Sequence, residues 1–124
     1  MQSLLLVAAG GALGSVARFL LSGLVLRQVP DWRFPLGTFT VNVVGCLVAG
    51  ILAGLAERNS LFTPQVRLLL FTGVLGGFTT FSAFGVETMF LLRRGDFAIA
   101  SANVVLSVVV GLAALALGLA ATSR

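Results

Sequence analysis

Long apolar segments separated by short polar turns make up most of the chain. Four of these segments are long enough to cross a bilayer, whose hydrocarbon core of about 30 Å takes roughly 20 residues of helix. Backbone that faces lipid has to satisfy its own hydrogen bonds, which favours helices for such segments. The pattern predicts an all-α membrane protein with a single four-helix transmembrane domain over residues 1–124, with helices at about 3–27, 34–57, 64–92 and 96–122.

The turns between these segments contain residues that interrupt or begin helices. Pro30 and Trp32 lie in the first turn, and Trp suits the headgroup interface of a membrane. The pair Thr63-Pro64 is a good start for the third helix, because Pro fits the first helical position. Residues 93–96 join the last two helices. Short connections of this kind make consecutive helices antiparallel neighbours.

The composition also indicates a protein that lies in lipid. Hydrophobic residues make up 58% of the chain and charged residues only 10%, whereas soluble domains contain roughly 25% charged residues. The mean hydropathy is +1.10, and a soluble fold of 12.8 kDa could not bury that much apolar surface. Because Cys46 is the only cysteine and there is no histidine, the sequence excludes an intrachain disulfide and a Cys/His metal cluster.

Positive charge is almost balanced between the two ends of the predicted helices. The end with both termini has Arg58, Arg67, Arg124 and the terminal amine, and the other end has Arg27, Arg33, Arg93 and Arg94. Arginine in short loops directs membrane orientation. The balance therefore predicts dual topology, with copies of opposite orientation paired about a two-fold axis in the membrane plane; the alternative is an orientation that other features fix. The arginines are scattered and form no patch, so nucleic-acid binding is not indicated.

The few polar residues within the apolar spans mark either packing contacts or a pathway, because such residues are costly in lipid. Asn42 interrupts an apolar run, and Thr38 lies one turn earlier on the same helix face. Asn103 and Ser107 repeat this spacing in the last span. Two interpretations of Asn42 are open: an interhelical hydrogen bond, or an uncharged donor to a passing anion. Two short polar stripes favour a lined path.

Two charged residues lie inside predicted spans. Arg18 in the first span has three interpretations: it reaches the membrane interface with its long side chain, it supplies charge to a vestibule, or it holds a neighbouring loop. Glu87 in the third span caps a helix, pairs with an arginine, or lies at the mouth of a pore. The sequence leaves these alternatives open.

The third span contains a predicted break near the middle of the bilayer. Gly76-Gly77 followed by Thr79-Thr80 is a poor sequence for a continuous helix. A break frees carbonyls and amides that have to be buried in protein or bind an ion, and freed carbonyls favour a cation such as Na⁺. Phe81 and Phe84 follow on one helix face, where they pack or turn the positive edges of their rings to an anion.

Together these motifs resemble the Fluc/CrcB family of bacterial fluoride channels. The similar stretches cover nearly the whole chain: Gly10–Gly14 with Arg18, Gly37–Cys46 with Asn42, and Gly73–Phe84 with Glu87. The resemblance implies a fluoride-selective, multi-pass channel of the bacterial plasma (inner) membrane. Such a channel lets cytoplasmic fluoride leave passively down its electrochemical gradient and confers fluoride resistance. It also implies an antiparallel dual-topology homodimer with two pores.

The same resemblance implies roles for individual residues. A structural Na⁺ at the dimer interface would be held by the backbone carbonyls of Gly76 and Thr79. The residues implied for the fluoride pore are Asn42, Phe81, Phe84, Thr38, Ser82, Asn103 and Ser107. Arg18 would lie at a vestibule and Glu87 at the end of the polar track. Ala83 and Gly85 replace hydroxyl residues that many members have, so the polar track is thinner here.

Other functions fit the sequence less well. A small multidrug-resistance exporter needs a carboxylate in the first helix, where the only charge is that of Arg18. A non-transporting assembly subunit explains the glycines and phenylalanines as packing, but it needs neither Asn42 nor a broken helix. An enzyme is not indicated, because the chain has no paired carboxylates, no histidine and no nucleophile beside a base.

Overall fold

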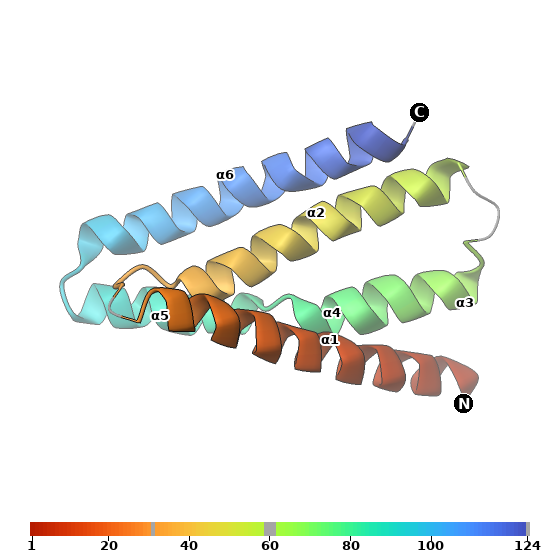
Figure 1. Ribbon diagram of the computed structural model, residues 1–124, viewed down its shortest axis with the longest axis horizontal. Helices are drawn as coiled ribbons and strands as arrows, with labels where there is room; N and C mark the ends of the chain where they lie inside the picture. Colours follow the sequence, from red (N-terminus) through yellow and green to blue (C-terminus); the bar gives the residue numbers. More distant parts are fainter. Residues whose placement is uncertain (31, 59–61, 124) are drawn as a thin grey trace.

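The computed structural model describes residues 1–30, 32–58 and 62–123, and this part of the chain forms four transmembrane-length helical units (Figure 1). The units are α1 (Gln2–Gln28), α2 (Leu36–Arg58), a composite third unit, and α6 (Phe97–Thr122). The third unit consists of α3 (Pro64–Arg67), the π-helix η1 (Leu68–Leu75), α4 (Gly76–Phe78) and α5 (Phe81–Arg93). The prediction of four spanning helices with an interrupted third is confirmed. Arg124, which entered the charge balance, lies outside the described residues.

The helices run antiparallel in sequence order and form two pairs (Figure 1). The blue α6 lies along the yellow α2 for most of its length, and this is the most extensive contact in the chain. The red α1 packs against η1 and α4, the first half of the third unit. Beyond the break, α5 turns to pack against α6 instead. The third unit therefore belongs to both pairs, and its break lies where it passes from one to the other.

The α2–α6 contact depends on glycines that bring the two backbones together. Gly50 and Gly54 of α2 and Gly118 of α6 are buried. A Cβ atom added at Gly118 would lie 2.5 Å from the carbonyl oxygen of Leu47, so a side chain there has no room. Small residues of this kind allow helices to approach closely in membranes, where the hydrophobic effect does not drive helices together.

Glycines also bring α1 against the centre of the third unit. A Cβ atom added at Gly77 would lie 2.5 Å from the carbonyl oxygen of Gly11, and one added at Gly10 would lie 2.9 Å from Cα of Gly73. The backbone of α4, just before the break, therefore lies directly against the backbone of α1. This contact brings Arg18, which lies further along α1, to the break.

Many large apolar side chains of the single chain are exposed, as expected for a surface that faces lipid or a second protein. The buried apolar side chains in the described part are Val41, Leu75, Leu91 and Ala100. By contrast, the α1 side chain of Phe19 is 75% exposed, and Phe81, beside the mid-span break, is 82% exposed. The chain alone has too small an interior to enclose a polar path.

We expect Gly118→Ala to weaken the α2–α6 contact, because the added methyl group meets the Leu47 carbonyl oxygen 2.5 Å away. Overpacking of this kind costs about 1–3 kcal/mol. The measurement is thermal unfolding of the purified protein in detergent. Gly111→Ala on the same helix is the matched control, because its added Cβ would lie at an ordinary 3.5 Å from Cys46 Sγ. Equal melting temperatures for the two variants would contradict the packing account.

Candidate functional site

The helical backbone of the third unit stops at Thr79 and Thr80. Their φ and ψ angles are −88° and 156°, and −149° and 116°, both in the extended region. The sequence predicted a break over Gly76-Gly77 and Thr79-Thr80; the two glycines are helical, and Gly77 serves the contact with α1. The hydroxyl of Thr79 donates to the Leu75 carbonyl at 2.8 Å, and the hydroxyl of Thr80 caps α5 by accepting from the Ala83 amide at 3.2 Å. Two threonines thus end one helix and begin the next.

The side chain of Asn42, on α2, replaces helical hydrogen bonds that the break removes. Its Nδ2 donates to the Thr80 carbonyl at 3.0 Å, and its Oδ1 accepts from the Thr80 amide at 2.9 Å. The interhelical interpretation of Asn42 is therefore correct for the chain itself. A carboxamide has a second N–H, for which the described residues provide no acceptor. The anion-donor interpretation rests on this remaining N–H.

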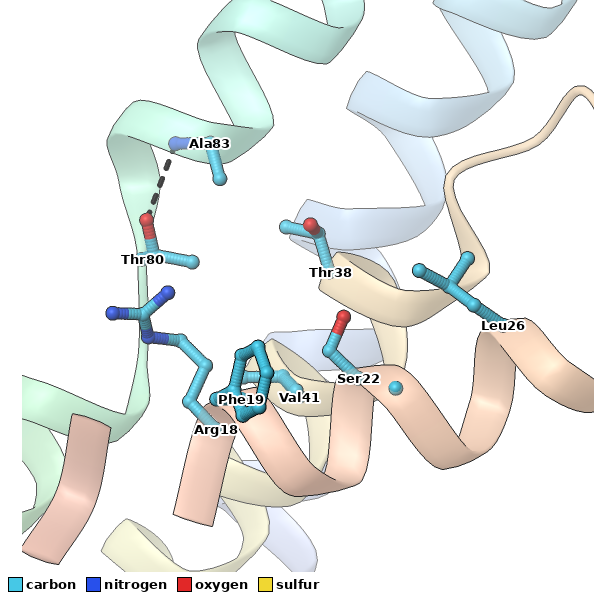
Figure 2. A pocket seen from close by; sticks show the side chains of 9 residues that line it. Arg18, Phe19, Ser22, Leu26, Thr38, Val41, Thr80 and Ala83 are labelled. Atoms are coloured by element: carbon cyan, nitrogen blue, oxygen red, sulfur yellow. Dashed lines mark hydrogen bonds between the residues drawn. The ribbon is translucent and has the colours of Figure 1, made fainter. Parts of the chain in front are cut away.

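Arg18 forms the second link between another helix and the break. Its Nε donates to the Gly77 carbonyl at 3.1 Å, so the side chain holds a neighbouring segment rather than only reaching the interface. The same residue lines a cavity of about 230 Å³ together with Ser22, Thr38 and Thr80. Figure 2 shows the guanidinium and the hydroxyls of Ser22 and Thr38 around one space. This space is a candidate vestibule with one cation and several hydroxyl groups.

The carbonyls of Gly76 and Thr79 lack the partners that a continuous helix would provide. The Thr80 amide, which would otherwise reach the Gly76 carbonyl, is bound to Asn42. Within the described ranges no hydrogen-bond donor reaches the carbonyl of Gly76 or of Thr79. Both residues line an open groove of about 430 Å³, which Asn42 and Phe81 also line. The groove presents acceptor oxygens at mid-span on the surface of the chain.

The phenylalanine pair lies directly after the break. The ring centroids of Phe81 and Phe84 are 5.4 Å apart with an angle of 43° between the ring planes. Phe81 is 82% exposed and Phe84 is partly buried, so the pair leads from the surface of the chain inward. Ser82 is exposed beside them, with its Oγ 3.3 Å from Oγ1 of Thr80.

Glu87 lies one turn beyond Phe84 and is half-buried beside Thr38 of α2. Its Oε1 is buried without a hydrogen-bond partner in the described part of the chain. No ion pair between Glu87 and an arginine occurs among the described residues. Glu87 therefore lies in the middle of α5, next to the residue through which α2 lines the 230 Å³ cavity.

The polar stripe of α6 forms a separate buried network. Asn103 is 1% exposed and donates through Nδ2 to Oγ1 of Thr88 at 2.9 Å. Ser107 donates to Oδ1 of Asn103 at 3.3 Å, and Thr88 donates to the carbonyl of Phe84 at 2.8 Å. The two polar stripes of the sequence thus meet different partners. The sequence analysis missed Thr88, although a hydroxyl one turn after Phe84 in an apolar span was a usable signal.

We expect Asn42→Leu to destabilise the protein, because it leaves both the amide and the carbonyl of Thr80 without a partner. Each unsatisfied buried group costs about 1–3 kcal/mol. Thermal unfolding in detergent measures the loss. Thr40→Val on the same helix is the control, since its hydroxyl forms no hydrogen bond to another helix within the described residues. An Asn42→Leu protein as stable as the control would show that the Asn42–Thr80 pair is dispensable.

Comparison with known proteins places these features in a family. A family model described as CrcB-like protein, Camphor Resistance (CrcB), matches residues 5–119. A protein of Methylobacillus flagellatus named fluoride-specific ion channel FluC is 63% identical, over 95% of this chain and 92% of its own length. Proteins of the same name from Opitutus terrae and Maridesulfovibrio salexigens are 50% and 42% identical, over 95% and 97% of this chain and 90% and 94% of their own lengths.

The family match covers all four helical units, including the break at Thr79-Thr80, Asn42 and the two phenylalanines. The resemblance that the motifs indicated is therefore confirmed over nearly the whole chain, and this multi-pass membrane protein belongs to the CrcB family.

Proposed function

We propose that this chain forms a fluoride-selective channel of the bacterial plasma membrane. Cytoplasmic fluoride leaves passively through this channel, which keeps the cytoplasmic fluoride concentration low. The observation that supports this most directly is the broken third span, where Asn42 and Phe81 line one groove at mid-membrane. Two relatives named fluoride-specific ion channel FluC are 63% and 50% identical to this chain, and each alignment covers 95% of it. The names of these relatives favour a channel rather than an enzyme for this chain.

A passive fluoride pore has a simple chemical use. Hydrogen fluoride is a weak acid whose neutral form crosses lipid, and it dissociates in a near-neutral cytoplasm, where the anion is trapped. An open route for the anion removes it down the electrochemical gradient. No energy source is required for this export, which agrees with a chain that has no nucleotide-binding motif.

The proposed pore replaces the tight water shell of a small anion without holding it too strongly. The groups available are the second N–H of Asn42, the hydroxyls of Thr38 and Ser82, and the ring edges of Phe81 and Phe84. Arg18 supplies positive charge only in the cavity at the side of the path. Neutral donors along the path and a single cation in the side cavity would let a small anion pass quickly without being bound strongly.

We expect the purified protein in potassium-loaded liposomes to release fluoride but almost no chloride when valinomycin clamps the voltage. Phe81→Leu keeps apolar volume but removes the ring edges, and it should slow fluoride release about tenfold, a loss of about 1.4 kcal/mol. Phe90→Leu is the matched control, because Phe90 is also exposed, at 57%, and lies on the opposite face of α5. No fluoride release from folded protein would refute the channel.

We also propose that two copies of opposite orientation form the functional unit, with a structural Na⁺ between them. Three features support this: the carbonyls of Gly76 and Thr79 without donors, the open groove that they line, and the 82% exposed ring of Phe81 beside it. Unwound carbonyls are typical Na⁺ ligands in membrane proteins. A second copy brought to this groove would double the number of carbonyls and cover the ring.

Removing Na⁺ should therefore weaken the dimer. We expect light scattering in detergent to show a dimer mass in sodium chloride, and a larger monomer fraction in N-methylglucamine chloride that sodium restores. Identical masses in both salts would contradict the sodium site, and a monomer in both would contradict the dimer.

Orientation is read in intact cells, because reconstitution into liposomes can insert a protein in both orientations. In a Ser123→Cys variant, a membrane-impermeant maleimide should label roughly half of the introduced thiols that it labels after permeabilisation. The reason is that the nearly balanced arginines favour neither orientation. Complete or zero labelling in a population of cells would instead show a single topology.

A further inference from the structure

The helix that presents the two phenylalanines is held by few contacts. Leu91, near its C-terminal end, is the only fully buried residue of α5. The helix packs mainly against α6 and barely against α2. At its N-terminal end the extended Thr79 and Thr80 uncouple it from α4. Rotation of α5 about its own axis therefore has to be fixed by a contact in its middle.

Thr88 provides such a contact with α6, the main partner of α5. Its Oγ1 donates to the Phe84 carbonyl at 2.8 Å and accepts from Nδ2 of Asn103 at 2.9 Å. Asn103 is itself fixed, because it is 1% exposed and its Oδ1 accepts from Ser107 at 3.3 Å. The hydroxyl of Thr88 thus joins the backbone of α5 to a buried amide of α6 at the level of Phe84.

Helical geometry ties this anchor to the rings. At about 100° per residue, Phe81 and Thr88 project within about 20° of each other, and Phe84 lies about 40° from Thr88. The three side chains therefore form one stripe along α5. Holding Thr88 against Asn103 sets the direction of that stripe, and with it the 5.4 Å tilted arrangement of the two rings.

We propose that Thr88 is a positioning residue of the conduction path: through its bond to Asn103 it fixes the orientation of Phe84 and Phe81, and thereby the rate of fluoride passage. The effect on fluoride rests on the proposed function. The effect on ring orientation does not, so the two parts are measured separately. Thr88 acts through the rings, and no contact between Thr88 and the ion is part of the proposal.

The first experiment follows the ring directly. We would incorporate 4-fluorophenylalanine at position 84 and record ¹⁹F spectra in the parent, Thr88→Ser and Thr88→Val proteins. We expect one resonance in the parent and in Thr88→Ser, which keeps the hydroxyl, and a shifted or divided resonance in Thr88→Val. Thr122→Val is the matched control, because Thr122 forms the same bond to the carbonyl one turn earlier, at 2.8 Å, far from the rings. An unchanged resonance in Thr88→Val would overturn the proposal.

The second experiment measures fluoride release from liposomes by the same variants. We expect Thr88→Val to be slower by about tenfold, which is a loss of about 1.4 kcal/mol, with Thr88→Ser and Thr122→Val within twofold of the parent. Asn103→Leu should resemble Thr88→Val, and the double variant should be no slower than either, because both remove one bond. A changed spectrum with unchanged release would overturn the functional half. A parent that releases no fluoride would refute the channel, while the spectra still decide ring positioning.

Discussion

Within a bilayer, a helix that stops leaves polar backbone groups with no water to accept or donate hydrogen bonds, and each such group costs several kcal/mol. This chain stops a helix at Thr79-Thr80, at the middle of its third span, and much of its structure serves that interruption. Asn42 reaches across from α2 and pairs with both the amide and the carbonyl of Thr80. Arg18 reaches across from α1 and takes the carbonyl of Gly77. Two of the few polar residues inside the spans are thus explained by backbone that has lost its helix.

The glycines follow from the same requirement. Arg18 and Asn42 reach the break only if α1 and α2 lie close to it, and a close approach needs residues without side chains. Gly77 lies against the backbone of α1, and a side chain at Gly45 would overlap Thr79. The contact of α2 with α6 is similarly close at Gly50 and Gly118. Since apolar burial does not hold helices together in lipid, close backbone contact and these hydrogen bonds do so instead.

Hydropathy and turn residues were sufficient to predict the four spans, because length and apolar character decide which segments cross a membrane. The break was also predicted, within the stretch from Gly76 to Thr80, and it lies at the end of that stretch, at Thr79-Thr80. Gly76-Gly77 has poor helix propensity, but both residues are helical and Gly77 packs against Gly11 of α1. The partners of Asn42 and Arg18 could not be derived, since they lie 38 and 59 residues away and depend on how the helices pack. Thr88 went unnoticed because its role depends on facing Asn103 across two helices.

The distribution of donors and acceptors at the break bears on how one feature could serve two ions of opposite sign. Asn42 occupies the amide of Thr80, so the groups left without partners at the break include the carbonyls of Gly76 and Thr79, which repel an anion and attract a cation. An anion in the proposed channel therefore has to keep to the rings, the hydroxyls and the second N–H of Asn42, although Asn42 and Phe81 line the same groove as these carbonyls. The carbonyls belong to α4 and to the extended segment, so the orientation of α5 sets only where the rings lie relative to them. For this reason the bond between Thr88 and Asn103 matters beyond local stability: in the proposed channel it fixes the direction of the rings, and with it their position relative to the carbonyls.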